Sequence, residues 1–270
     1  MIALVVVSVL FVLALLFLFC LKGRTGHKTM AELRRWNYAH RGLHNSEKPE
    51  NSMAAFRAAL EGGYGIELDV HLMKDGNLAV IHDSSLKRTA GADVKIEDLT
   101  LADLENYRLG GTDEKIPLFS QVLELFEGKA PLIVELKTAG DNHAALSDAA
   151  CKMLDSYNCT YCIESFDPRC IIWLRKHRPR IVRGQLSENW LKSKTKLPWI
   201  LKLVMTCHIS NIATCPDFIA YNYKHRKAFG TDICRKLWGV QGVSWTIRTK
   251  EDFDIAVREG WIPIFENFIP

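Results

Sequence analysis

The sequence predicts an α/β protein built as a TIM (β/α)8 barrel with a small insertion after the second strand, preceded by an N-terminal transmembrane helix. The first observation is an uncharged apolar run at the start of the 270-residue chain. The second is the size of the remaining chain, because roughly 250 residues is usual for such a barrel. The third is a repeated order of short apolar runs and amphipathic stretches, which is typical of a parallel sheet with helical crossovers.

Residues 1–21 carry no charged side chain. A helix of this length spans about 31 Å, close to the hydrocarbon thickness of a bilayer. No basic residue precedes the run, and bulky side chains surround Cys20, so a cleaved leader or a lipoprotein is disfavoured. The basic residues follow the run, at positions 22, 24, 28, 34 and 35. The positive-inside rule therefore predicts a single-pass membrane protein with its soluble domain on the cytoplasmic side.

The composition is ordinary for a globular protein, with 48% apolar and 24% charged residues. The net charge of +4 does not indicate a nucleic-acid partner. The eight cysteines show no framework of paired spacings, so free thiols are expected in a reducing compartment. No glycine-rich phosphate loop follows any predicted strand, which disfavours nucleotide binding.

After a basic linker at 22–35, the barrel is expected over residues 36–270. Its predicted strands are 36–40, 65–70, 78–81 (short and additional), 131–136, 161–165, 181–184, 218–221, 240–245 and 262–265. The predicted helices are 52–61, 119–127, 143–156, 169–177, 225–237 and 250–259. Residues 84–116 are expected as a polar insertion with a helical stretch at 101–106.

Residues 187–216 combine a strongly apolar run with several lysines. Two interpretations remain open for this segment. It is either an ordinary amphipathic helix of the barrel or a helix that lies on an anionic membrane surface beside the anchor.

Acidic side chains gather late in two predicted strands. Glu67 and Asp69 share one strand face, and Glu135 shares the face of a later strand with Lys137. Catalytic groups of such barrels sit at the C-terminal ends of the strands. Three carboxylates at one mouth repel each other, and a hard divalent ion, Mg²⁺ or Ca²⁺, resolves this. The alternative is that they pair with Arg41 and Lys137 and bind nothing.

His40 and His82 also stand at strand ends. An imidazole titrates near neutral pH, so these two side chains are candidates for general acid and base. Arg41 and Lys137 add fixed positive charge beside the acids, which suits an anionic phosphoryl group.

Three further residues are candidates for supporting roles. Glu50 either holds metal or orients a neighbour. Asn51 is a possible helix N-cap. His71 lies on the strand face of Glu67 and Asp69, where it is a candidate outer metal ligand or partner of a ligand.

Together these motifs resemble the glycerophosphodiester phosphodiesterase family. The matching motifs, in order, are HRG at 40–42, PENS at 49–52, ELDV at 67–70, KDG at 74–76, VIHD at 80–83, LKRTAG at 86–91 and VELK at 134–137. Weaker matches are ESFD at 164–167 and SWT at 244–246. No single motif is specific, but the ordered set is, and the likeness covers nearly all of the soluble part.

The resemblance implies metal ligation by Glu67, Asp69 and Glu135, and acid–base roles for His40 and His82. It also implies cleavage of glycerophosphodiesters to sn-glycerol 3-phosphate and an alcohol. The implied route is attack by the glycerol hydroxyl of the substrate, giving a cyclic phosphate that water then opens.

The resemblance further implies that Arg41 and Lys137 contact phosphate and that Trp245 lines the pocket near the alcohol. Two features depart from the family pattern. Residues 264–267 read IFEN and lack the usual Thr-Asp, and segment 187–216 is longer and more apolar than a soluble member needs.

These departures leave the substrate open between soluble glycerophosphodiesters and lysophospholipids or glycolipid headgroups. Two further alternatives are a phospholipase C-like barrel, which the motif order argues against, and a non-catalytic membrane-anchored barrel. The presence of both histidines and all three carboxylates argues against the second.

Overall fold

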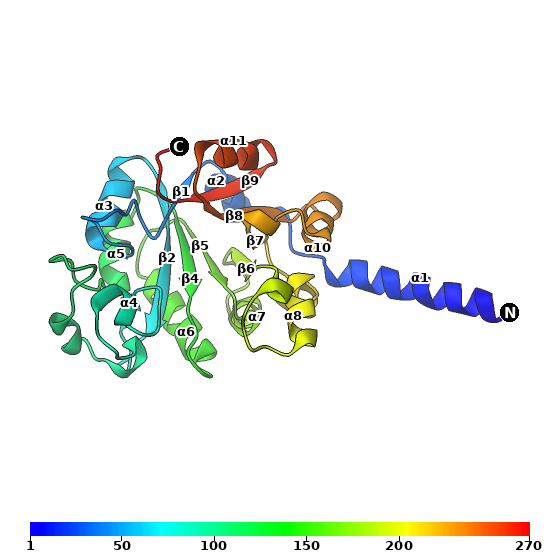
Figure 1. Cartoon of the computed structure of the whole chain (residues 1–270), viewed down its shortest axis with the longest axis horizontal. Helices are drawn as coiled ribbons and strands as arrows, with labels where there is room; N and C mark the ends of the chain where they lie inside the picture. Colours follow the sequence, from blue (N-terminus) through cyan, green and yellow to red (C-terminus); the bar gives the residue numbers. More distant parts are fainter.

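The computed structural model describes residues 1–270 and shows a closed barrel of eight parallel strands (Figure 1). The barrel closes because β1 pairs with both β2 and β9. Its strands are β1 (Tyr38–His40), β2 (Gly65–Leu72), β4 (Leu132–Leu136), β5 (Tyr161–Ser165), β6 (Arg183–Ser187), β7 (Phe218–Asn222), β8 (Gln241–Ile247) and β9 (Trp261–Phe265). The additional strand β3 (Leu78–Val80) pairs antiparallel with the end of β2. The predicted fold class is confirmed.

Helices cover the outside of the barrel. They are α3 (Met53–Glu61), α5 (Phe119–Phe126), α6 (His143–Leu154), α7 (Pro168–His177), α8 (Trp199–Thr206), α9 (Asn211–Thr214), α10 (Phe229–Asp232) and α11 (Lys250–Arg258). Side-chain caps define several helix starts. Ser52 caps α3 through Ala55 N–H, and Asp167 caps α7, which begins with Pro168.

The main hydrophobic core lies between the outer faces of the strands and these helices. Ile66, Leu68 and Val70 of β2 are fully buried there against Phe56 and Phe119. Their alternation with Glu67 and Asp69 leaves the carboxylates on the inner face of the barrel. The apolar residues of the motif therefore hold the strand in register and fix the direction in which the acids point.

A short helix that was not predicted from the sequence closes the N-terminal end of the barrel. Residues 22–35 were expected to be a linker, but α2 (Lys28–Leu33) lies within them. Met30 and Leu33 are buried with Tyr38, whose hydroxyl donates to the carbonyl of Leu33 at 3.0 Å. Their i, i+3 spacing was the signal for this amphipathic turn.

The insertion between β3 and α5 has a small core of its own and contains α4 (Lys87–Ala90), η1 (Ile96–Asp98) and η2 (Asp103–Asn106). The expected helical stretch at 101–106 is a single 3₁₀ turn. A second difference concerns the predicted helix at 225–237. It divides into η4 (Tyr223–His225), α10 and a π turn at Ile233–Leu237.

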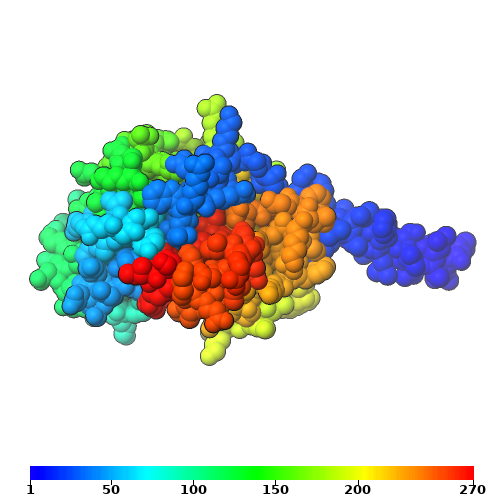
Figure 2. Space-filling model, turned by 90° about the horizontal axis from the view of Figure 1, so that it is seen from above, coloured from blue at the N-terminus to red at the C-terminus, as the bar shows by residue number.

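Helix α1 (Ile2–Cys20) projects away from the barrel as an isolated rod, as Figure 2 also shows. It is long and apolar enough to cross a membrane, with a mean hydropathy of 3.3. None of its apolar stretch is buried against the rest of the protein. Leu21, which follows the helix, is fully buried with Ile219, Cys234 and Val240. The base of the rod is therefore packed onto the barrel.

His208, which follows α8, makes the stability of the fold sensitive to acid. Its side chain is fully buried, and Nε2 is hydrogen-bonded to Thr231 Oγ1 at 3.0 Å. Burial lowers the pKa of His208 to about 4. The unfolded chain therefore binds a proton near pH 5 that the folded chain does not, so stability falls as pH drops from about 6.5 toward 4, by up to about 3 kcal/mol.

The measurement is the thermal unfolding transition at neutral pH and at about pH 5. His208 has a φ of +59°, which asparagine tolerates, so His208→Asn is the matched variant that cannot titrate. We expect a smaller acid-induced drop in the variant. Equal drops in both proteins would contradict this role of His208.

Candidate active site

The three acidic residues expected to bind metal come together at the C-terminal side of the barrel. Asp69 of β2 is in register with Glu135 of β4, and Glu67 lies two residues earlier on the same face of β2. One carboxylate oxygen from each lies within 4.8 Å of the others. All three side chains are buried, so this carboxylate cluster (Glu67, Asp69, Glu135) carries its charge away from bulk water.

Two cations contact the carboxylate cluster. Lys137 Nζ lies 3.0 Å from Asp69 Oδ1 and 2.8 Å from Glu135 Oε1. Arg41 Nε lies 3.3 Å from Asp69 Oδ2. Burial opposes the ionisation of Asp69, but Lys137 and Arg41 together hold its pKa well below its ordinary value.

A fourth buried carboxylate, Glu164, stands next to Glu135 in the register of β4 and β5. Burial and the neighbouring acids raise the pKa of Glu67 and Glu164 well above their ordinary values. Burial also raises the pKa of Glu135 to about 7, despite the nearby Lys137. Four acids against two cations leave two negative charges to be neutralised when all are ionised.

These residues fit a divalent cation. The donors are all carboxylate oxygens, which hard ions such as Mg²⁺ and Ca²⁺ prefer. The charge of such an ion, +2, equals the net negative charge that remains when all four acids are ionised beside Arg41 and Lys137. In addition, Glu164 Oε2 is buried without a hydrogen-bond partner. Arg41 and Lys137 alone do not compensate four ionised carboxylates, and without an ion burial and mutual repulsion favour protonation of Glu67, Glu135 and Glu164.

The two candidate acid–base histidines line the same cavity of about 310 Å³ as Glu67 and Glu135. His40, at the end of β1, is hydrogen-bonded through Nδ1 to Glu266, and its Nε2 lies 3.8 Å from Glu67 Oε2. His82, just after β3, is hydrogen-bonded through Nδ1 to Asp83 at 2.7 Å.

Burial lowers the pKa of His40 and of His82, although Glu266 and Asp69 respectively work against this. In each ring one nitrogen is held by a carboxylate. This fixes the orientation of the imidazole and leaves Nε2 outside that hydrogen bond.

The HRG motif forms a tight backbone turn that directs Arg41 back over the carboxylate cluster. Arg41 has a φ of +55°, which is uncommon for a residue with a Cβ. Gly42 has a φ of +81°, and a Cβ there would meet the backbone of Ala55 at 2.8 Å. The turn is tied to β2 by the Arg41 N–H, which donates to the Glu67 carbonyl at 2.9 Å.

Glu50 contacts a cation beside the cluster, and Asn51 contacts the cluster itself. Glu50 Oε1 accepts hydrogen bonds from Arg41 at 2.8 Å and from Arg88 at 2.7 Å. Asn51 Nδ2 donates to Asp69 Oδ2 at 2.8 Å. The N-cap interpretation of Asn51 is wrong, because Ser52 is the cap of α3.

His71 lies outside the carboxylate cluster. Its Nδ1 pairs with Glu97 of the insertion at 2.7 Å, and its Nε2 contacts the carbonyl oxygen of His82 at 3.2 Å. Neither nitrogen contacts Glu67 or Asp69. His71 therefore joins the insertion to β2 and supports the backbone that carries His82.

Trp245 lines the cavity, as expected from the sequence. Together with Phe166, Leu186 and Ile264 it supplies the apolar part of the cavity wall. The Trp245 and Phe166 rings meet edge to face with centroids 5.6 Å apart. The cavity therefore offers both charged and aromatic side chains, as the phosphate and organic parts of a phosphodiester require.

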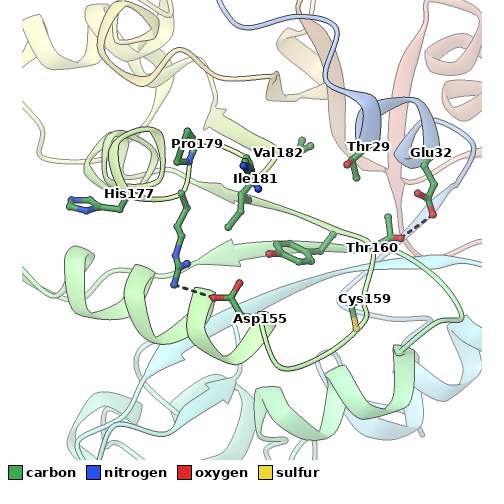
Figure 3. A pocket seen from close by; sticks show the side chains of 12 residues that line it. Thr29, Glu32, Asp155, Cys159, Thr160, His177, Pro179, Ile181 and Val182 are labelled. Atoms are coloured by element: carbon green, nitrogen blue, oxygen red, sulfur yellow. Dashed lines mark hydrogen bonds and ion pairs between the residues drawn. The ribbon is translucent and has the colours of Figure 1, made fainter.

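A larger cavity, of about 540 Å³, lies near the opposite ends of β5 and β6 (Figure 3). Thr29 and Glu32 of α2 line one side of it, and His177 lies across from them. Glu32 Oε1 accepts a hydrogen bond from Thr160 at 2.9 Å. None of the predicted site residues lines this cavity, so size does not identify the active site here.

Comparison with known proteins decides the family. The family described as "Glycerophosphoryl diester phosphodiesterase family" matches residues 40–269. The chain belongs to this family. A glycerophosphodiester phosphodiesterase of Caldanaerobacter subterraneus subsp. tengcongensis is 30% identical over 235 residues, which cover 82% of this chain and 89% of that protein. A lysophospholipase D of Homo sapiens is 34% identical over 133 residues, covering 44% of this chain and 41% of its own length.

Solved structures of other members share the fold. A phosphodiesterase of Oleispira antarctica, in complex with the product sn-glycerol-3-phosphate, superposes with a TM-score of 0.72 at 22% identity. The match covers 90% of this chain and 95% of that one. A glycerophosphodiester phosphodiesterase of Thermotoga maritima gives a TM-score of 0.65 at 25% identity, covering 85% and 92%.

Sequence reasoning missed several polar residues in the cavity of this phosphodiesterase family member. Glu164 had a usable signal, because it lies on the same inward face of β5 as Cys162, while Ile163 between them joins the outer core. Glu266 lies in the segment that departs from the family pattern. It bonds His40 and also accepts from Arg248 at 2.6 Å.

Proposed function

We propose that the chain hydrolyses glycerophosphodiesters to sn-glycerol 3-phosphate and an alcohol. The observation that carries this is one cavity lined by two imidazoles, by Glu67 and Glu135 of the carboxylate cluster and by the cations Arg41 and Lys137. The names of the relatives support the substrate class, and the related Oleispira antarctica protein binds sn-glycerol-3-phosphate.

Glu67, Asp69 and Glu135 would hold a divalent ion, Mg²⁺ or Ca²⁺. When bound there, such an ion supplies charge neutralisation for the phosphoryl group and makes a nearby hydroxyl more acidic. Arg41 and Lys137 bind the remaining phosphoryl oxygens. The guanidinium offers a fork and the ammonium a point charge.

The two histidines move the protons. One of His40 and His82 accepts the proton of the substrate's free glycerol hydroxyl as its oxygen bonds to phosphorus. The other donates a proton to the departing alcohol oxygen as its bond to phosphorus breaks. The product of this step is a cyclic phosphodiester. The roles then reverse, because a water molecule loses a proton as it attacks phosphorus and the ring oxygen gains one. The aromatic wall at Trp245 accommodates the alcohol.

A second substrate class is lysophospholipids. The Phe166 ring, which lines the cavity, meets both Trp245 and Trp190 edge to face, the latter at 5.5 Å. Trp190 belongs to η3 (Trp190–Lys192), so an aromatic path leads from the cavity into segment 187–216. An acyl chain would find apolar contacts along that path.

We also propose that α1 anchors the protein as a single membrane span. The basic residues that follow it, including Lys22 and Arg24, favour a cytoplasmic location for the barrel. Arg24 is a fixed part of the fold, because it donates hydrogen bonds to both oxygens of Asp217 at 2.6 Å.

The experiment is a turnover screen with the full-length chain in detergent, supplied with Mg²⁺ or Ca²⁺. The substrates are glycerophosphodiesters of choline, ethanolamine, glycerol and inositol, together with lysophosphatidylcholine. Release of glycerol 3-phosphate or lysophosphatidic acid supports the proposal, and the preferred substrate identifies the alcohol. Release of phosphocholine would indicate phospholipase C-like cleavage instead. If no substrate gave a product, the alternative of a non-catalytic membrane-anchored barrel would be favoured.

A further inference from the structure

One flank of the barrel presents bulky apolar side chains to solvent. Six of them lie on α8, α10 and the π turn after α10, and their side chains are 36–73% exposed. We call this surface the docking face: Trp199, Ile200, Leu201, Leu203, Phe229 and Leu237. Single exposed apolar residues are normal on soluble proteins, but a group of bulky ones on neighbouring elements marks an interaction site. The end of α8 and α10 are neighbours, because His208, just after α8, is hydrogen-bonded to Thr231 of α10.

Helix α8 has the reverse of the pattern expected for a barrel helix. Trp199, Ile200 and Leu201 are consecutive and all exposed, while the buried positions are Met205 and Thr206 near its end. An ordinary helix of the barrel turns its apolar face to the sheet and its polar face to water. The water-facing side of α8 is therefore built for an apolar environment.

The α10 part of the docking face contacts α1. The rings of Phe17 and Phe229 are stacked with centroids 6.3 Å apart and planes inclined by 6°. Trp238 Nε1 donates a hydrogen bond to the carbonyl of Leu18 at 2.8 Å. In Figure 1, α8 and α10 lie on the side of the barrel from which α1 projects. The apolar patch thus begins where the candidate span ends.

Positive charge borders the docking face. Segment 187–216 carries four lysines close to α8, and no acidic residue lies between Glu188 and Asp217. These lysines are Lys192, Lys194, Lys196 and Lys202. A row of lysines beside exposed aromatic and aliphatic side chains is typical of surfaces that enter the headgroup region of anionic bilayers.

We propose that the docking face inserts into the surface of an anionic lipid bilayer, the same bilayer that α1 crosses. Lipid is the occupant because the patch contacts a helix whose length and composition suit hydrocarbon, and because the lysines complement anionic headgroups. Trp190, which precedes α8, contacts the cavity wall at Phe166. Docking therefore holds the mouth of the catalytic cavity beside the lipid surface.

The test uses the full-length chain in lipid nanodiscs that contain phosphatidylserine and brominated phosphatidylcholine. Bromine on the acyl chains quenches a tryptophan that enters the bilayer. The chain has seven tryptophans, so the emission of Trp199 is obtained as the difference between the parent and Trp199→Phe. Trp36→Phe is the matched control, because Trp36 packs against the main core beside α2.

We expect brominated lipid to remove most of the Trp199 emission and to leave that of Trp36 unchanged. Emission of Trp199 that brominated lipid does not quench would overturn the proposal. A chain that does not purify together with the discs would also overturn it. Equal quenching in discs of phosphatidylcholine alone would overturn the role of anionic lipid. The readout does not depend on turnover, so failure of the proposed activity and failure of docking are distinguishable.

Discussion

We expect replacement of His40 or His82 with alanine to lower turnover by about 10²–10⁴-fold, the range for a positioned general acid or base. Each imidazole has one nitrogen held by a carboxylate, Glu266 or Asp83, and the other directed to the cavity that contains the acids and Lys137. Alanine removes the group that moves the proton and leaves the phosphate contacts in place. The measurement is kcat on a glycerophosphodiester that the full-length chain cleaves.

His177→Ala is the matched control, since His177 is exposed and lines the cavity at the other end of the barrel. It should leave kcat unchanged. The thermal unfolding transition of each variant shows whether the fold survives. A well-folded His40→Ala or His82→Ala protein with parental kcat would remove that residue from the mechanism.

Glu266→Gln separates the orientation of His40 from its chemistry. Glutamine keeps a hydrogen-bonding group near Nδ1 but loses the negative charge that favours the protonated imidazole. We expect a smaller loss of kcat than in His40→Ala. The pKa of His40 should also fall, so the limb of the pH–rate profile that reports His40 moves to lower pH. A profile and kcat identical to those of the parent would show that Glu266 does not act through His40.

Replacing Glu67 or Glu135 with glutamine weakens divalent-metal binding by more than the roughly 10–100-fold that is typical when a partner of a ligand is lost. Each change removes one of three carboxylate ligands and one unit of the charge that attracts the ion. Titration calorimetry with Mg²⁺ and with Ca²⁺ measures the effect directly. Asn51→Gly is the comparison, because it removes only the hydrogen bond to Asp69 and suits the φ of +55° at that position.

The Glu67→Gln variant should remain folded without metal. Burial and the neighbouring acids raise the pKa of Glu67 well above its ordinary value, so without an ion the neutral carboxyl, which an amide resembles, is favoured. We expect an unchanged thermal transition in chelator and a loss of the added stability that metal gives the parent. Parental metal affinity in both glutamine variants would show that these carboxylates are not ligands.

The chemistry of the site was predictable because strand geometry is local. The alternation in ELDV fixes which side chains of β2 face inward, and the parallel register then brings Glu135 beside Asp69. The same rule would have identified Glu164. The partner of His40 was not predictable in this way, because Glu266 lies 226 residues away and in a segment without the family pattern.

The fold was predictable at the level of repeated units and less so in its connections. The outer core of β2 and β4 follows from apolar alternation. By contrast, α2 exists because Met30 and Leu33 close the end of the barrel, which depends on tertiary contacts. Segment 187–216 also resisted assignment, because its apolar side chains face outward and periodicity alone does not show which side of a helix meets the sheet.

The decisive experiment is release of glycerol 3-phosphate from a glycerophosphodiester by the full-length chain, first in chelator and then with Mg²⁺ or Ca²⁺ restored. We expect no release in chelator, because the ion that Glu67, Asp69 and Glu135 would hold is then removed, and recovery of turnover when one of the two ions is added. Turnover that is equal with and without chelator would contradict a metal-dependent phosphodiesterase site.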